Sequence, residues 1–352
     1  MSMNNAWLEK DVAVINSDWL NYAKQKQDNL TKPPGSLGML EQLAIRFSAF
    51  QGCAKPGINT VQIVIFAADH GIAAEGVSAF PQAVTVEMVR NFARGGAAIS
   101  VLAKELGADL EVINLGTVAE HEALGGVIDQ RISAGTANFS QQPAMSEQQL
   151  ATALQAGREA VQRARQSGAQ LFIGGDMGIA NTTAASALAC ALLNASPEQL
   201  AGPGTGLDQQ GVDHKAAVIK KSIEQHSAAL DSPLRILQHL GGYEIAALTG
   251  AYIAAAQAGL PVLVDGFITG VAALFAVKIQ PAVKQWMLFS HASAEPGHVI
   301  IMQALNAKPL LDFGMRLGEG SGAATVVPLI RLACALHNGM ATFEQAGVSN
   351  KE

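Results

Sequence analysis

The chain has 352 residues, of which 49% are hydrophobic and only 15% charged, and its formal net charge is −6. Such a chain can bury a sizeable core, which excludes a disordered polar protein. The acidic balance, with no basic patch to offset it, argues against nucleic acid as a main partner. Its three cysteines include no CxxC pair, which excludes a disulfide scaffold and a cysteine zinc site and favours the cytoplasm.

The first residues do not resemble a signal peptide, because Glu9, Lys10 and Asp11 precede any apolar run. The most membrane-like stretch is residues 245–260. It contains Gln257 and ends before Pro261, and it is shorter than the about 20 residues that a membrane-spanning helix needs. We expect a buried, alanine-rich helix there and no membrane partner.

From about residue 60, short apolar runs of strand length alternate with helical stretches. This alternation predicts an α/β fold with a mostly parallel, doubly wound (Rossmann-like) sheet covered on both faces. The expected strands are 62–67, 110–115, 170–173, 262–264 and 286–289, and helices are expected at 97–106, 147–166 and 244–258. Both chain ends are predicted to be helical. We expect a large α/β catalytic domain over residues 56–326 and a small helical domain made of residues 1–55 and 327–352.

Polar side chains follow several of the predicted strands. In open parallel sheets, ligands bind beyond the carboxyl ends of the strands. Asp69, Asp176, Asp265 and Ser290 are therefore candidates for a binding site by position alone. Each of them could equally well cap the helix that follows its strand.

Motifs for common cofactors and metals are missing from the sequence. There is no Gly-Lys dipeptide and hence no P-loop, no HExxH, and no pair of adjacent acidic residues such as magnesium-diphosphate sites use. Residues 318–323 fit the dinucleotide pattern GxGxxA, but they lack a preceding strand and a later acidic residue. His70 and His291 follow strands and are more typical of helix caps or core hydrogen bonds than of metal ligands. We expect a mechanism without metal or cofactor.

Two glycine-rich segments suit a phosphate group. The loop at residues 202–206 (GPGTG) can offer backbone N–H groups, and Lys215 follows it as a counter-charge. Residues 178–183 open an apolar helix expected at 184–193, whose N–H and hydroxyl groups also suit an anion. Glycine loops mostly just turn the chain, so it is the two loops together with the lysine that favour phosphate binding.

Glu319 is set among Gly318, Gly320 and Gly322. So many glycines cost backbone entropy unless the chain must approach a ligand closely. A carboxylate buried among small residues is poorly solvated and prepared to accept a proton. The alternative is an exposed loop glutamate without a chemical role.

Taken together, these segments resemble the nicotinate-nucleotide–dimethylbenzimidazole phosphoribosyltransferase family. The matching stretches run in order over about residues 32 to 340, nearly the whole chain. They are 32–41 (KPPGSLGMLE), 67–76 (AADHGIAAEG), 80–92 (FPQAVTVEMVRNF), 174–183 (GGDMGIANTT), 241–244 (GGYE), 264–267 (VDGF), 290–295 (SHASAE) and 315–322 (MRLGEGSG). The resemblance implies a parallel α/β sheet, a small helical domain from both termini and a homodimer.

The resemblance also implies a reaction and the residues that serve it. The phosphoribosyl group of nicotinate mononucleotide would pass to 5,6-dimethylbenzimidazole, giving α-ribazole 5′-phosphate and nicotinate in the assembly of the lower ligand of cobalamin. Glu319 would be the general base. At position 176 the family is expected to carry glutamate, so Asp176 is one methylene shorter. The residues implied around the nucleotide and the aromatic base are Gly178, Gly204, Gly206, Lys215 and Ser293 for phosphate and ribose, and Phe80, Met88, Met177 and Leu317 for the base.

Two other classes of function stay open. A related transferase could use the same donor with a phenolic acceptor, and it would differ only in the slot around Phe80 and Met88. A regulatory nucleotide-binding protein without catalysis would require the loss of Glu319, which is present.

Overall fold

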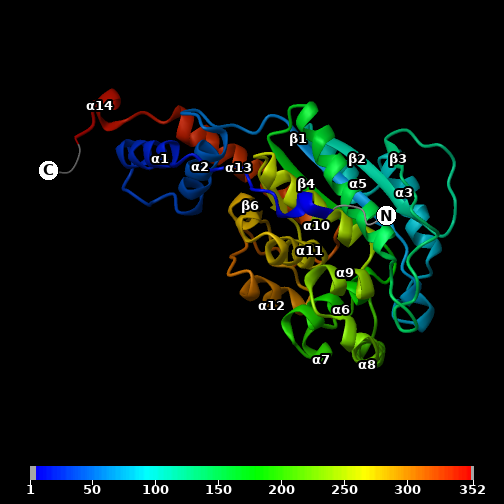
Figure 1. Cartoon of the computed structure of the whole chain (residues 1–352). Helices are drawn as coiled ribbons and strands as arrows, with labels where there is room; N and C mark the ends of the chain where they lie inside the picture. Colours follow the sequence, from blue (N-terminus) through cyan, green and yellow to red (C-terminus); the bar gives the residue numbers. More distant parts are fainter. Residues whose placement is uncertain (1–4, 350–352) are drawn as a thin grey trace.

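The computed structural model describes residues 5–349. Its centre is a six-stranded sheet in the order β3-β2-β1-β4-β5-β6, and every neighbouring pair is parallel (Figure 1). The strands are β1 (Val61–Ala68), β2 (Asp109–Gly116), β3 (Val127–Asp129), β4 (Leu171–Met177), β5 (Val262–Val264) and β6 (Met287–Phe289). The predicted α/β fold and parallel sheet are confirmed. The edge strand β3 was missed, because it is only three residues long and none of them is buried.

The strand order positions a ligand crevice. The chain runs outward from β1 to β2 and β3, and then returns to add β4, β5 and β6 on the other side of β1. This is the doubly wound order, in which the reversal between the first and fourth strands opens a crevice at their carboxyl ends. Phe66 of β1 is in register with Asp176 of β4, so both strands end at the same level.

Helices cover both faces of the sheet. Connections between parallel strands are right-handed. Those that run from β1 towards β3 and those that run from β1 towards β6 therefore place their helices on opposite faces of the sheet. On one face lie α3 (Ala83–Arg94), α4 (Ala98–Leu106) and α13 (Ser321–Gly339), and on the other lie α5 (Glu147–Gln166), α10 (Tyr243–Gln257) and α11 (Phe267–Ile279). Further helices are α6 (Asn181–Leu193), α7 (Pro197–Leu200), α8 (Gln209–His226), α9 (Pro233–Leu240) and α12 (Gly297–Ala304), with short 3₁₀ turns η1 (Asn5–Glu9), η2 (Gly71–Glu75), η3 (Ser227–Ala229) and η4 (Pro281–Trp286).

The alanine-rich helix predicted near residues 245–260 is α10. Every residue of α10 before Gln257 is buried, because the helix lies between the sheet and α5. Across residues 5–349, no helix is long and apolar enough to cross a membrane.

Helices α5 and α10 touch through their backbones at Gly157. A side-chain carbon at Gly157 would collide with the backbone oxygen of Ala247 in α10. We expect Gly157→Ala to lower the free energy of unfolding by about 1–3 kcal/mol, the usual cost of overpacking a core. Urea denaturation measures this value. Gly125→Ala is the matched control, since nothing lies within 4 Å of its new carbon, and an equal loss in both variants would contradict the argument.

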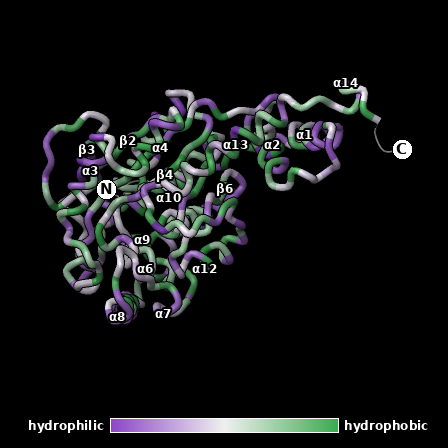
Figure 2. Tube along the Cα trace, turned by 180° about the vertical axis from the view of Figure 1, so that it is seen from behind, coloured by the Kyte–Doolittle hydropathy of each residue, from purple (hydrophilic) through white to green (hydrophobic). Residues whose placement is uncertain are grey.

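Helices from the first 51 residues lie beside helices from the end of the chain at one side of the molecule (Figure 1). There α1 (Ser17–Asn29) and α13 both pack against α2 (Met39–Gln51), and Leu30 pairs with Thr342, just before α14 (Phe343–Ala346), in a β-bridge. Seen from behind, α1 and α8 carry hydrophilic stretches at the margin of the molecule (Figure 2). The division into domains 1–55 plus 327–352 and 56–326 stays a prediction, and its residues 1–4 and 350–352 lie outside the described residues.

Candidate active site

A cavity of about 350 Å³ lies beyond the carboxyl ends of β4, β5 and β6. This volume is typical of small-molecule sites. Most of the predicted site residues line its wall, although they come from segments far apart in the sequence. They are Phe80, Met88, Asp176, Met177, Gly178, Gly204, Asp265, Ser293, Leu317 and Glu319. Gly206 and Lys215 are not part of the wall.

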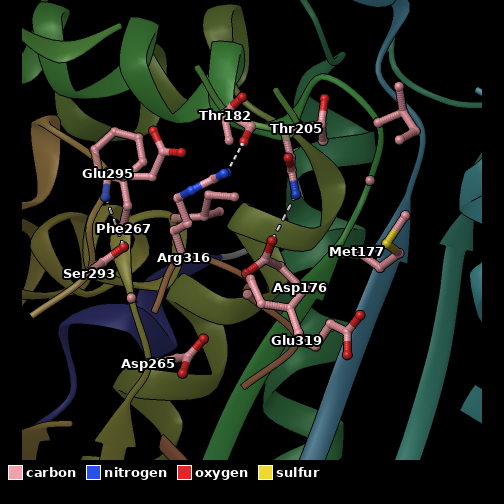
Figure 3. A pocket seen from close by; sticks show the side chains of 18 of the residues that line it. Asp176, Met177, Thr182, Thr205, Asp265, Phe267, Ser293, Glu295, Arg316 and Glu319 are labelled. Atoms are coloured by element: carbon pink, nitrogen blue, oxygen red, sulfur yellow. Dashed lines mark hydrogen bonds between the residues drawn. The ribbon is translucent and has the colours of Figure 1, made fainter. Parts of the chain in front are cut away.

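One half of the cavity is acidic. Figure 3 shows the carboxyl groups of Asp176, Asp265 and Glu319 in its lower part. Burial raises the pKa of Asp176 well above its usual value, and the neighbouring charges of Glu244, Asp265 and Glu319 raise it further. Asn181 Nδ2 donates a hydrogen bond of 2.8 Å to Asp176. The acidic half therefore favours the protonated form of Asp176.

Asp265 joins β5 to the start of α13. Its Oδ1 accepts the backbone N–H of Ala323 at 2.7 Å, and the N–H groups of Gly320 and Gly322 also point to it. Burial raises the pKa of Asp265 to about 7, although the hydrogen bonds from these N–H groups lower it. His291 Nε2 lies 3.7 Å from Oδ1, beyond hydrogen-bond range, and burial lowers the pKa of His291, which disfavours a charged pair with Asp265.

Glu319 stands in the turn that leads into α13. Its backbone φ is +63°, a left-handed conformation that is strained for a residue with a side chain. The side chain lies in the cavity wall and is 6% exposed, so the alternative of an exposed loop glutamate is wrong. Burial raises the pKa of Glu319, while a 3.5 Å hydrogen bond from the N–H of Ile99 opposes the shift. The strained turn thus presents a poorly solvated carboxyl group to the cavity.

Two of the candidates chosen by strand position turn away from the cavity. Asp69 accepts the Thr85 hydroxyl at 2.6 Å and the Val118 N–H at 2.8 Å. The Ser290 hydroxyl donates to the backbone oxygen of Asp265 at 2.9 Å. Neither lines the wall, so the prediction of site residues by position was wrong for these two. Both residues brace the loops that carry the site, and neither caps the helix that follows its strand.

A buried ion pair lies near the acidic half, where the charge of Glu244 acts on Asp176. His70 Nε2 and Glu244 Oε1 are 2.7 Å apart and neither side chain is exposed. Burial lowers the pKa of His70, but the charge of Glu244 outweighs it and the net pKa is raised. Within residues 5–349, no group of three or more His, Cys, Asp or Glu side chains could hold a metal ion.

The other half of the cavity contains the glycine loop and positive charge. Lys215 Nζ donates to the Gly202 oxygen at 3.0 Å and to the Thr182 hydroxyl at 3.2 Å. The side chain is 1% exposed and stands behind the wall, and burial lowers the pKa of Lys215 to about 8. Arg316 Nη1 donates to the oxygen of Gly204 at 3.0 Å (Figure 3).

Sequence reasoning missed Arg316 and Glu295 as wall residues. Arg316 lies three residues before Glu319 in the same matched stretch, and Glu295 ends the stretch 290–295. Both residues therefore lie within stretches that match the family, but nothing in the sequence shows that their side chains reach the glycine loop. Gly206 is the last residue of that loop, with a φ of +118°, and lies outside the wall.

The apolar side of the cavity opens to solvent. Phe80 and Leu317 are 51% and 58% exposed, and Met88 on α3 is half-buried beside them. These side chains border the same cavity as Glu319, so an aromatic ring placed between them would face its carboxyl group. The arrangement can hold an anionic group at one end, a flat apolar ring at the other, and a proton acceptor between.

Comparisons with known proteins agree with this geometry. Residues 12–348 match the family model described as "Phosphoribosyltransferase". The nicotinate-nucleotide–dimethylbenzimidazole phosphoribosyltransferase of Pseudomonas aeruginosa is 60% identical over 329 residues, which is 94% of either chain. The protein of the same name from Pseudomonas putida strain W619 is 56% identical over 349 residues, 99% of either chain.

A solved structure of similar fold bears the same name. The crystal structure of nicotinate-nucleotide–dimethylbenzimidazole phosphoribosyltransferase from Thermus thermophilus superposes with a TM-score of 0.90 at 42% identity. The match covers 96% of this chain and 100% of that one. The chain therefore belongs to the family of nicotinate-nucleotide–dimethylbenzimidazole phosphoribosyltransferases.

Proposed function

We propose that this enzyme transfers the phosphoribosyl group of nicotinate mononucleotide to 5,6-dimethylbenzimidazole. The products are α-ribazole 5′-phosphate and nicotinate, and the reaction supplies the lower ligand of cobalamin. The observation that carries the proposal is the placement of Glu319. Its buried carboxyl group lies in one cavity with an apolar slot and with a glycine loop backed by Lys215.

The leaving group requires little help from the protein. In nicotinate mononucleotide the ring nitrogen bonded to ribose C1′ is cationic, and when that bond breaks its electron pair stays on nitrogen. Nicotinate thus departs with a neutral pyridine ring and needs no general acid. The acidic half of the cavity, with Asp265 and Glu319, favours the positive charge that develops on the ribose in the transition state.

The acceptor supplies the proton that must be removed. A lone pair on one benzimidazole nitrogen forms the new bond to C1′, and the proton on the other nitrogen becomes acidic. Glu319 takes that proton as general base, a role that typically contributes about 10²–10⁴-fold to the rate. Holding both rings in line across the ribose contributes the entropic part of the acceleration.

The site residues take two further roles in this proposal. Gly178, Gly204, Gly206, Lys215 and Ser293 surround the phosphate and ribose, and Phe80, Met88, Met177 and Leu317 hold the acceptor ring. What supports this is the position of ten of the twelve proposed residues, Asp176, Asp265 and Glu319 included, in the wall of one cavity. We further propose that the enzyme works as a homodimer in the cytoplasm. The three free cysteines suit a reducing compartment, and two of them are buried.

The acceptor slot provides the test of the proposed function. We expect purified enzyme with nicotinate mononucleotide to release nicotinate quickly with 5,6-dimethylbenzimidazole and at least about tenfold less efficiently with adenine. An apolar slot lined by Phe80, Met88 and Leu317 leaves the polar edge of a purine without partners. Chromatography of the products measures both rates.

The same panel includes p-cresol as a phenolic acceptor. A preference for the phenol would favour the related transferase class, and binding of nucleotide without any transfer would favour a regulatory protein. A clear preference for adenine would contradict the assignment of the slot.

A further inference from the structure

Three charged side chains hold the short segment Gly202–Gly204 of the glycine loop. Lys215 Nζ donates to the oxygen of Gly202, and Arg316 Nη1 donates to the oxygen of Gly204. The N–H of Gly204 points to the carboxylate of Glu295. That carboxylate also lies directly against Gly202, because a side-chain carbon there would collide with its Oε2 atom.

Glu295 thus places a negative group on the loop that is proposed to bind phosphate. Figure 3 shows its carboxyl group in the same half of the cavity as Arg316 and Thr182. The side chain is almost fully buried, and the charges acting on it are those of Lys215 and Arg316. His298, one turn further along, is neutral near pH 7 because burial lowers its pKa to about 4.

A phosphate oxygen and an ionised Glu295 compete for the same donor. The Gly204 N–H can serve only one of them well, and two anions side by side repel each other. If Glu295 takes a proton, its O–H can donate to the phosphate instead of repelling it. Burial already raises the pKa of Glu295, while Lys215, Arg316 and the Gly204 N–H hold it down. A bound phosphate takes the Gly204 N–H and places a second negative charge beside the two cations, and both changes raise the pKa of Glu295 further.

We propose that Glu295 is a specificity-determining residue of the phosphate subsite, which gives up the Gly204 N–H and takes up one proton when the nucleotide binds. The proton comes from solvent and resides on the Glu295 carboxyl group in the complex. The inference rests on the proposed function, since it requires the nucleotide phosphate to bind at this loop. In the free enzyme, Glu295 keeps the loop and both cations in place and weakens the binding of phosphate.

The test compares nucleotide affinity in wild type and Glu295→Gln by calorimetry between pH 5 and 7.5 without acceptor. At pH 7.5 we expect the variant to bind nicotinate mononucleotide about tenfold more tightly, because glutamine is neutral and can donate a hydrogen bond to the phosphate. A tenfold change in affinity corresponds to one proton taken up across one pH unit. The difference should shrink as the pH falls, because a growing fraction of wild-type Glu295 is then protonated before the nucleotide binds. Nicotinate riboside, which lacks the phosphate, should bind both proteins equally.

Two further variants make the test specific. Glu198→Gln changes the same charge on an exposed residue of α7 and should bind like wild type. Glu295→Asp keeps a titrating carboxyl group and should keep the pH dependence, with proton uptake measured in buffers of different ionisation enthalpy. Weaker binding by Glu295→Gln, or a difference that does not depend on pH, would overturn the role of Glu295.

Failure of the proposed function gives a different result. Nicotinate release with 5,6-dimethylbenzimidazole is measured on the same wild-type preparation. If wild type releases no nicotinate, the proposed function is wrong. Normal release, together with weaker binding of nicotinate riboside than of the mononucleotide, supports the proposed function and the phosphate site. If the difference in nucleotide affinity between wild type and Glu295→Gln is then independent of pH, only the role of Glu295 is overturned.

Discussion

Replacing Glu319 by glutamine should lower kcat for phosphoribosyl transfer by at least about 100-fold, the usual scale for a general base. Glutamine keeps the size of the side chain and can still contact the Ile99 N–H, but it cannot accept a proton. Affinity for nicotinate mononucleotide should change little, because Thr182 and Arg316 lie in the other half of the cavity (Figure 3), where Lys215 supports the glycine loop from behind the wall. Steady-state kinetics and calorimetry on one preparation measure both quantities.

The pH profile gives the same experiment a second readout. Only the ionised form of Glu319 can act as a base, so the wild-type rate should fall as the pH drops through its pKa. Burial raises that pKa, so the decline begins above the usual value of 4.5. Glu319→Gln should lack this acidic limb.

A structural role for Glu319 would give the opposite pattern. The variant would then lose thermal stability and keep its turnover. Glu105→Gln, on an exposed position of α4, is the control for the change in charge. A folded Glu319→Gln enzyme with kcat near that of wild type would end the assignment of the general base.

Replacing Lys215 by methionine should raise the KM for nicotinate mononucleotide by about 10–100-fold, since a hydrogen bond from a charged group contributes about 1.5–3 kcal/mol. Methionine fills the buried space without a charge. The KM for 5,6-dimethylbenzimidazole should stay nearly unchanged, because its slot lies around Phe80 and Leu317. Initial rates with each substrate varied in turn separate the two constants.

The lowered pKa of Lys215 also predicts that the rate declines at high pH. Its pKa is lowered to about 8, so the charge is present below that pH and is lost as the pH rises through it. The value of kcat/KM for the nucleotide should therefore fall above about pH 8 in wild type and show no such fall in Lys215→Met. Lys220→Met, on an exposed position of the same helix, is the control. An equal loss with nicotinate riboside, which has no phosphate, would show that Lys215 does not serve the phosphate.

Local patterns in the sequence determined the class of fold and the chemical character of the site. Apolar runs alternating with helices, such as residues 62–67 before the helix at 97–106, indicate a parallel sheet because buried strands need apolar residues on both faces. The glycines around Glu319 likewise point to an unusual backbone at a functional position, and its φ of +63° is one. These properties depend on neighbours in the chain, and a sequence displays them directly.

Only the tertiary structure decided which polar groups meet. Asp69 and Asp265 both follow buried strands, but Asp69 turns to Thr85 and Val118 while Asp265 faces the cavity and the start of α13. The contact of Glu295 with the Gly202 loop was equally invisible in the sequence. Such contacts join residues far apart in the chain, and they depend on the depth at which each strand ends and on the space its neighbours leave. A sequence pattern records the residue types at these positions, whereas the direction of each side chain follows from how the whole molecule packs.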